Sequence, residues 1–259
     1  MRISFSYVMP KWLCAIFLFS LIWIAVILHA ADNESWLSRG DALYLKRAEV
    51  SANIEALGDY EKALEREPSN PEILWKAARA AWWAGTRSTV LKERIGFFQK
   101  GMELGEKAIS LAPNSVEAQF WYGGNCASYG NDKGAFTSLF LIKKIRRTMA
   151  DVIRLDEKYM GAGGHRILGI LDYKVPGIVG GDPKRAKEHL EKALTIQSDN
   201  PVTRFYYAEY FFETGSPEKA REQLAILDKQ PVPPDWEPEL EIIKVPHADL
   251  LKRLSSLKK

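Results

Sequence analysis

Apolar residues recur at helical spacing through most of this chain, and residues 181–215 show the pattern most clearly. The apolar positions at the start of this stretch fall on one face, at Ala186, Leu190, Ala193 and Leu194. Spacings of three and four residues are typical of an amphipathic α-helix. Asp182 is a residue type that caps helix N-termini, and Pro183 suits the first helical position. We therefore predict a helix that begins after Asp182 and a second helix that ends near Gly215.

The same pattern returns with a fixed period. Ala186 and Ala220 occupy equivalent positions about 34 residues apart, the period of tetratricopeptide repeats. Two earlier segments share a second pattern, in which a small residue is followed four, seven and twelve positions later by the other members of the set. The two sets are Ala56, Tyr60, Ala63 and Pro68, and Gly101, Gly105, Ala108 and Pro113. This spacing resembles the second helix of tetratricopeptide repeats. We predict an all-α fold, a right-handed tetratricopeptide-type solenoid of about five helix pairs plus a C-terminal capping helix.

The N-terminal segment differs from the rest because residues 12–31 form one uncharged apolar run behind Arg2 and Lys11. Basic residues, an apolar core and the small residues Ala30 and Ala31 are typical of a secretory signal. The run is about 20 residues long, which is also enough to span a bilayer. Residues 1–31 are therefore a signal peptide or an N-terminal membrane anchor. Both alternatives place the remaining chain in the periplasm or elsewhere outside the cytoplasm, and the second anchors it to the inner membrane.

The chain after this segment divides into a helical repeat domain at residues 32–235 and a capping segment at residues 236–259. Four prolines break the helical pattern near this boundary, at Pro231, Pro233, Pro234 and Pro238. A last amphipathic helix is predicted from Pro246 onward, with lysines at its C-terminus, where the helix dipole favours them. We expect this helix to cap the end of the repeat array.

Charge and composition exclude several functional classes. The formal net charge is +3, and without residues 1–30 the chain keeps 34 basic against 33 acidic residues. A nearly neutral domain is not expected to bind nucleic acid. After cleavage Cys126 is the one cysteine left, so no intrachain disulfide is expected. The histidines are scattered without metal-ligand spacing, and no Ser–His–Asp arrangement is indicated. We predict a protein that is not an enzyme and has no catalytic residues, metal or cofactor.

Three further motifs are interpreted structurally. Residues 161–166 are glycine-rich but lack the Gly-Lys-Ser/Thr of a phosphate loop, so we expect the glycines to let helices approach closely. The Gly-Gly-Asp of residues 180–182 is expected to be a loop and a helix cap. A basic cluster, Lys143, Lys144, Arg146 and Arg147, is interpreted as a solvated helix face, with contact to a membrane surface or an acidic partner as the alternative.

Residues 159–186 resemble a more particular family. They contain an aromatic residue, a glycine-rich turn with histidine, a Leu-Gly pair and a Gly-Gly-Asp-Pro sequence. The matching residues are Tyr159, Gly163, Gly164, His165, Leu168, Gly169, Pro176, Gly180, Gly181, Asp182, Pro183 and Ala186. This arrangement is similar to that of periplasmic tetratricopeptide proteins associated with TRAP transporters. The resemblance implies an extracytoplasmic helper that binds a protein partner, such as a solute-binding protein, or a small apolar ligand.

Aromatic residues define the candidate binding site. In helical repeats the first helix of each pair lines the concave groove. Counting from each repeat start, the groove is predicted to carry Trp75, Arg79, Trp82, Phe120, Arg166, Tyr173, Phe205 and Phe212. Rings interleaved with arginine suit a peptide segment or an apolar carboxylate, although any one ring could instead be core.

The functional prediction follows from this groove. We predict that the protein is a non-enzymatic binding scaffold that mediates protein–protein interaction through this groove. The alternative is a small-molecule carrier or chamber accessory to a TRAP-type solute transporter. The sequence leaves open whether the chain forms oligomers.

Overall fold

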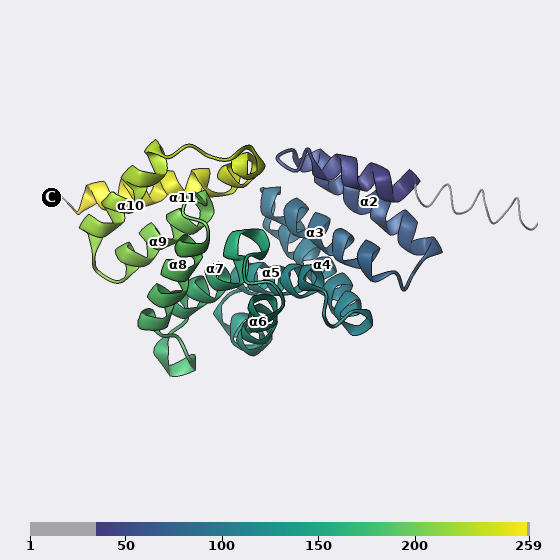
Figure 1. Ribbon diagram of the computed structural model, residues 1–259, viewed down its shortest axis with the longest axis horizontal. Helices are drawn as coiled ribbons and strands as arrows, with labels where there is room; N and C mark the ends of the chain where they lie inside the picture. Colours follow the sequence, from purple (N-terminus) through teal and green to yellow (C-terminus); the bar gives the residue numbers. More distant parts are fainter. Residues whose placement is uncertain (1–34, 258–259) are drawn as a thin grey trace, which may run out of the picture.

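The computed structural model describes residues 35–257, which form an all-α array without a β-strand (Figure 1). Helices pair with their neighbours along the chain: residues 35–44 with α2 (Val50–Arg66), α3 (Pro71–Arg87) with α4 (Leu91–Leu111), α5 (Val116–Lys133) with α6 (Ala135–Leu155), α7 (Tyr159–Lys174) with α8 (Pro183–Ile196), and α9 (Pro201–Glu213) with α10 (Pro217–Lys229). Two 3-10 turns, η1 (Gly177–Val179) and η2 (Pro234–Trp236), and a final helix, α11 (Glu237–Ser256), complete the described chain. The predicted all-α solenoid is confirmed.

The apolar run of residues 12–31 lies outside the described residues. Within residues 35–257, no helix combines the length and apolar character needed to cross a membrane. The structure therefore describes the repeat array and the final helix.

Side-chain caps fix where several helices begin. Asn70 Oδ1 accepts hydrogen bonds from the backbone N–H groups of Glu72 and Ile73. Asp182 Oδ1 does the same for Lys184 and Arg185, so the predicted cap is confirmed. A proline follows the cap in both helices, where its missing N–H costs no hydrogen bond. The start of each helix is therefore encoded locally in the sequence.

Small residues of the repeat pattern lie where paired helices cross. Ala56, Ala63 and Ala186 are at most 1% exposed. At Gly163, an added Cβ would fall 2.4 Å from the Phe120 ring, closer than carbon atoms can approach. The glycines of residues 161–166 therefore allow close helix packing, as predicted.

The final helix begins earlier than the sequence pattern predicts. It starts at Glu237 and continues through Pro246, which the sequence analysis took as its beginning. A proline inside a helix removes one backbone hydrogen bond. Burial of Ile243, Leu250 and Leu254 in the same apolar cluster as α9 and α10 holds the helix together on both sides of the proline.

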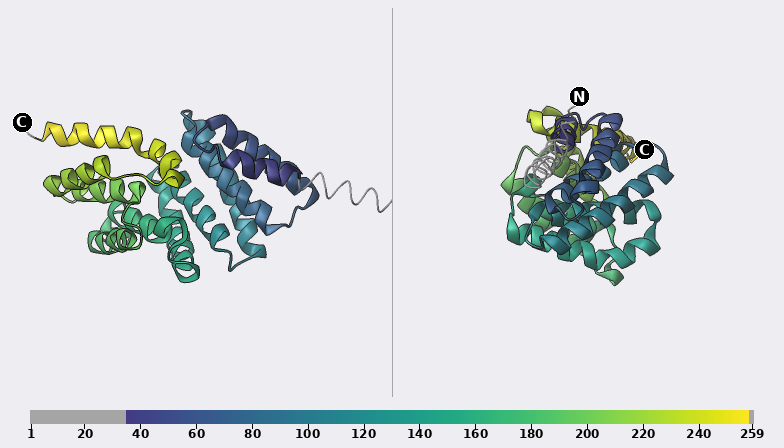
Figure 2. Two further views of the ribbon diagram at one scale, coloured as in Figure 1. Left: turned by 45° about the horizontal axis from the view of Figure 1, so that its top comes forward. Right: turned by 90° about the vertical axis from the view of Figure 1, so that its right-hand side faces the viewer.

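The loop after the first helix lies beside η2 and the beginning of α11 (Figures 1 and 2). Arg47, after the first helix, pairs with Glu239 of α11 through Nε–Oε1 and Nη2–Oε2 distances of 3.3 and 3.2 Å. It also donates to the carbonyl oxygen of Asp235, and its guanidinium lies over the rings of Tyr44 and Trp83. We call this set of contacts the end clasp. It connects the first and last parts of the described solenoid.

Candidate functional site

The first helices of successive pairs, α3, α5, α7 and α9, contact one another in order and build the inner wall of the solenoid. On α3, Trp75, Arg79 and Trp82 share one face and are each half-buried. Tyr173 and Phe212 are also half-buried, on α7 and α9. These five predicted groove residues keep part of their surface accessible.

The other three predicted groove residues are interior. Phe120 is 5% exposed, Arg166 is 6% exposed and Phe205 is 1% exposed. Phe120 packs against Trp121 and Tyr159 with ring centroids 5.1 and 5.3 Å apart, because neighbouring repeats close over it. These three side chains therefore support the inner wall and do not form its surface, contrary to the sequence analysis.

The half-buried Trp82 ring of α3 is held by the next repeat. Trp82 donates from Nε1 to Ser128 Oγ of α5 at 3.1 Å, and its ring lies 5.6 Å from that of Trp121. Trp121 in turn donates to the hydroxyl of Tyr159 on α7 at 3.2 Å. We call Trp82, Trp121, Phe120 and Tyr159 the aromatic row. It runs across three repeats, so each ring has a fixed orientation.

Arg79 stands beside this row. Its guanidinium lies 3.5 Å from the ring centre of Tyr44 and 5.0 Å from that of Trp75. One Nη donates to the hydroxyl of Tyr60 at 3.3 Å, whereas the buried Nε has no acceptor among the described residues. Burial raises the pKa of Tyr44, and the nearby Arg79 and Arg47 charges counteract part of that rise. Arg79 Nη2 also lies 3.6 Å from Asp41 Oδ1, so the guanidinium is stacked, oriented and already paired with a carboxylate.

Arg166 has a structural role. It donates to the carbonyl oxygens of Met160 and Gly161 at 3.2 Å and to Thr203 Oγ1 at 3.3 Å. Met160 and Ala162 have positive φ angles of 49° and 58°, a conformation that costs a residue with a Cβ about 1–2 kcal/mol. Burial lowers the pKa of Arg166 to about 10. This buried cation therefore holds a left-handed turn at the start of α7.

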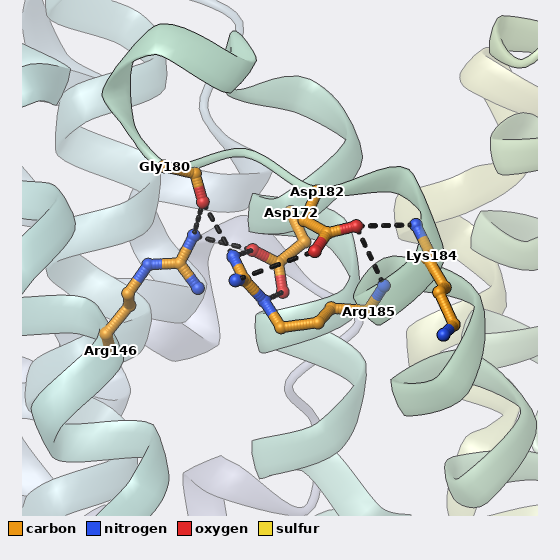
Figure 3. Close-up of polar contacts among 6 residues, drawn as sticks. All are labelled: Arg146, Asp172, Gly180, Asp182, Lys184 and Arg185. Atoms are coloured by element: carbon orange, nitrogen blue, oxygen red, sulfur yellow. Dashed lines mark hydrogen bonds and ion pairs between the residues drawn. The ribbon is translucent and has the colours of Figure 1, made fainter.

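The loop between α7 and α8 is fixed by a buried carboxylate that the sequence analysis missed (Figure 3). Asp172 is fully buried and accepts hydrogen bonds from Arg146 at 2.5 Å and from Arg185 at 2.9 and 3.2 Å. The Gly180 carbonyl oxygen accepts from both arginines. The sequence does contain a signal for this buried carboxylate, because Asp172 stands within the otherwise apolar residues 168–173.

The charge of Asp172 is stabilised by these contacts. Burial alone would raise the pKa of its carboxyl, but hydrogen bonds from Arg185 and Arg146 outweigh burial and hold the pKa below its ordinary value. Arg146 therefore pairs with the buried carboxylate of Asp172. This corrects the interpretation of Arg146 as part of a solvated helix face.

Two histidines that are separate in sequence meet in space. The Nδ1 atoms of His165 and His189 lie 2.8 Å apart, and His165 Nε2 lies 3.1 Å from Glu157 Oε1. Burial and the neighbouring His165 lower the pKa of His189. Within residues 35–257, no group of three or more His, Cys, Asp and Glu side chains is arranged to hold a metal ion. The pair is a packing contact between α7 and α8.

A surface cavity of about 210 Å³ lies between α2, α3 and α4. Its lining consists of Leu64, Pro68, Leu74, Lys100, Glu103, Leu104 and Lys107. None of the predicted groove residues lines it, and its volume is below the roughly 300–1,000 Å³ of typical small-molecule sites. The inner wall therefore remains the candidate site.

The helix pairs and inner wall define a tetratricopeptide-type helical repeat protein. Residues 42–245 match the family model described as TRAP transporter T-component, and the chain belongs to this family. This membership makes the protein an accessory of a transporter or a scaffold for protein interactions, and indicates a location outside the cytoplasm. No curated protein matches the chain.

Solved structures show the same fold at low sequence identity. A thermophilic TPR protein of Thermus thermophilus has a TM-score of 0.62 at 20% identity, covering 85% of this chain and 98% of its own. PilF of Pseudomonas aeruginosa has a TM-score of 0.55 at 16% identity, covering 87% of this chain and 90% of its own. These similarities support the fold and not a shared partner.

Proposed function

We propose that this protein is an extracytoplasmic accessory of a TRAP-type transporter that binds a protein partner on its inner wall. The observation that carries the proposal is the face of α3. There Trp75 and Trp82 are partly accessible, while Tyr44 of the first helix contacts Arg79 and Ser128 of α5 accepts from Trp82, so that this face is held in place. A surface that is already ordered loses little conformational entropy when a partner binds. Aromatic and arginine side chains are also the residue types that dominate binding energy at protein interfaces.

The partner we propose is the solute-binding protein of the same transporter. It would place an exposed peptide segment against Trp75, Arg79 and Trp82. Tyr173 and Phe212 extend the accessible surface toward α9, and the buried Phe120, Arg166 and Phe205 keep the wall rigid from behind. When residues 1–31 are retained, they tether this scaffold to the inner membrane.

One observation favours a second function, a carrier for a small apolar carboxylate. The Nε of Arg79 has no acceptor among the described residues, and the aromatic surface of Trp75 lies next to it. Because this Nε is buried, a carboxylate would pair with the Nη atoms of the same guanidinium in place of Asp41, which lies 3.6 Å from Nη2, while its apolar tail lies along the rings. In that case the inner wall would hold the ligand, and the protein would deliver it to the transporter.

Calorimetric titration of the full chain with the solute-binding protein tests the leading proposal. We expect Trp82→Ala to weaken binding by about 2 kcal/mol, or roughly 30-fold, if Trp82 is a central contact. Trp36→Ala is the matched control. Trp36 is also half-buried, but it packs under Lys62 of α2. Thermal melts of both variants show whether each one is folded.

The result separates the two functions. Equal affinities for wild type, Trp82→Ala and Trp36→Ala would show that the inner wall does not bind this partner. Native mass spectrometry of the gently purified protein then tests the carrier. A bound mass of a few hundred daltons that is lost in Arg79→Met would support the second function.

A further inference from the structure

Two aromatic rings on α6 are exposed when the described residues are considered. Phe136 is 76% exposed and Phe140 is 69% exposed, and their ring centroids lie 5.1 Å apart. Leu139, between them in sequence, is 44% exposed. Single exposed apolar residues are common on protein surfaces, whereas a contiguous group usually marks a contact surface.

Unpaired cations continue the same face of α6. Phe136, Phe140, Lys143 and Arg147 follow one another at steps of four, three and four residues, so they form one stripe along the helix. Lys143 and Arg147 are exposed, and neither has a hydrogen-bond or ion-pair partner among the described residues. Nearby Lys144 differs, since it lies 3.4 Å from Glu106. The stripe therefore has an apolar half and a positive half.

The loop between α7 and α8 adds another apolar side chain to this side of the molecule. Ile178, in η1, is 96% exposed. Arg146 of α6 donates to the Gly180 carbonyl oxygen at 2.8 Å, so the loop lies beside α6 and is held there. Figure 1 shows α6 and the loop together at the lower edge of the solenoid. Phe136, Leu139, Phe140, Ile178, Lys143 and Arg147 are called the α6 patch below.

We propose that the α6 patch rests on an anionic lipid surface. Aromatic rings are favoured at the level of lipid headgroups, and exposed basic side chains are attracted to anionic ones. The patch presents both together, and the next carboxylate along this face, Asp151, pairs with Arg154 at 2.8 Å. The apolar residues 12–31 directly precede the described fold, and in the anchored form they hold it at a bilayer. This contact is separate from partner binding on the inner wall and orients the solenoid against the membrane.

The test uses the full chain reconstituted into vesicles of phosphatidylcholine, with or without phosphatidylglycerol. Cys14→Ser removes one thiol and leaves Cys126, which is buried. Leu139→Cys then carries an environment-sensitive fluorophore, and nitroxide-labelled lipids quench it if it reaches the bilayer. The control label is at Val245→Cys, which is 77% exposed on α11 at the opposite edge of the molecule.

We expect quenching at residue 139 in anionic vesicles to exceed that at residue 245 several-fold. The double variant Phe136→Ser/Phe140→Ser should reduce it to the level at residue 245. The double variant Lys143→Gln/Arg147→Gln should make quenching at residue 139 equal in anionic and neutral vesicles.

Two results would overturn the proposal. One is equal quenching at residues 139 and 245. The other is a label at residue 139 that is shielded from water but not quenched by lipid, with shielding that falls on dilution. The second result would assign the α6 patch to contact with another copy of the chain.

Discussion

Asp172→Asn removes one negative charge at a fully buried position while keeping the shape of the side chain. It leaves Arg146 and Arg185 facing a neutral amide. Removing one partner of a buried ion pair costs about 3–5 kcal/mol. The two arginine side chains are 28% and 46% exposed, so both can recover some hydration. We therefore expect a loss at the low end of the range, about 3 kcal/mol in the free energy of unfolding.

Urea and thermal unfolding followed by circular dichroism measure this loss. For a chain of this size, about 3 kcal/mol corresponds to a fall in Tm of about 6–12 °C. The pH dependence gives a second readout. The folded pKa of Asp172 is depressed, so its charge stabilises the fold above the unfolded value of about 3.9. That stabilisation is lost as pH falls through the folded pKa, so wild type and variant should converge in acid.

Asp182→Asn is the matched control, because Asp182 lies at the other end of the same loop and its side chain is 40% exposed. Asparagine caps helices as well as aspartate does, so stability should change by less than about 0.5 kcal/mol. Limited trypsin digestion should cut Asp172→Asn faster at Lys174 and leave the control unchanged. A loss below about 1 kcal/mol in Asp172→Asn would refute the view that this carboxylate holds the loop.

Two other predictions concern packing and pH. Gly169→Ala places a methyl carbon 2.7 Å from Leu190 Cγ and should cost about 1–3 kcal/mol, whereas Gly58→Ala, with open space around it in α2, should stabilise by about 0.5–1 kcal/mol. Paired thermal melts compare them, and equal shifts would contradict the packing argument. The lowered pKa of His189 means that the unfolded chain binds its proton more readily, so stability should fall as pH drops below about 6.5. Urea midpoints for wild type and His189→Gln measure this, and equal pH slopes would count against it.

Features fixed by neighbours in sequence were predictable. Asp182 and Pro183 begin α8 as expected, because a cap needs only the backbone N–H groups that follow it. The small residues Ala56 and Ala186 are buried at helix crossings for the same kind of local reason. The fold class therefore followed from spacing alone.

Features that depend on the curvature of the array were not predictable. The position of a residue on the first helix of a pair did not reveal whether the next repeat would cover it, as happens at Phe120 and Phe205 but not at Trp82. The pairing of Arg146 with Asp172 joins two helices and a loop whose relative position is set by packing. The accessible part of the candidate site therefore required the structure.

The end clasp has a consequence for how this molecule can move. A linear repeat array gains stability from neighbouring units and can fray independently at each end. Here Arg47 and Glu239, which are 192 positions apart, link the first repeat to the beginning of α11. The parts that the clasp joins therefore cannot move apart like the ends of a spring unless the clasp breaks. A partner whose binding separates α11 from the first repeat must therefore compete with the Arg47–Glu239 pair.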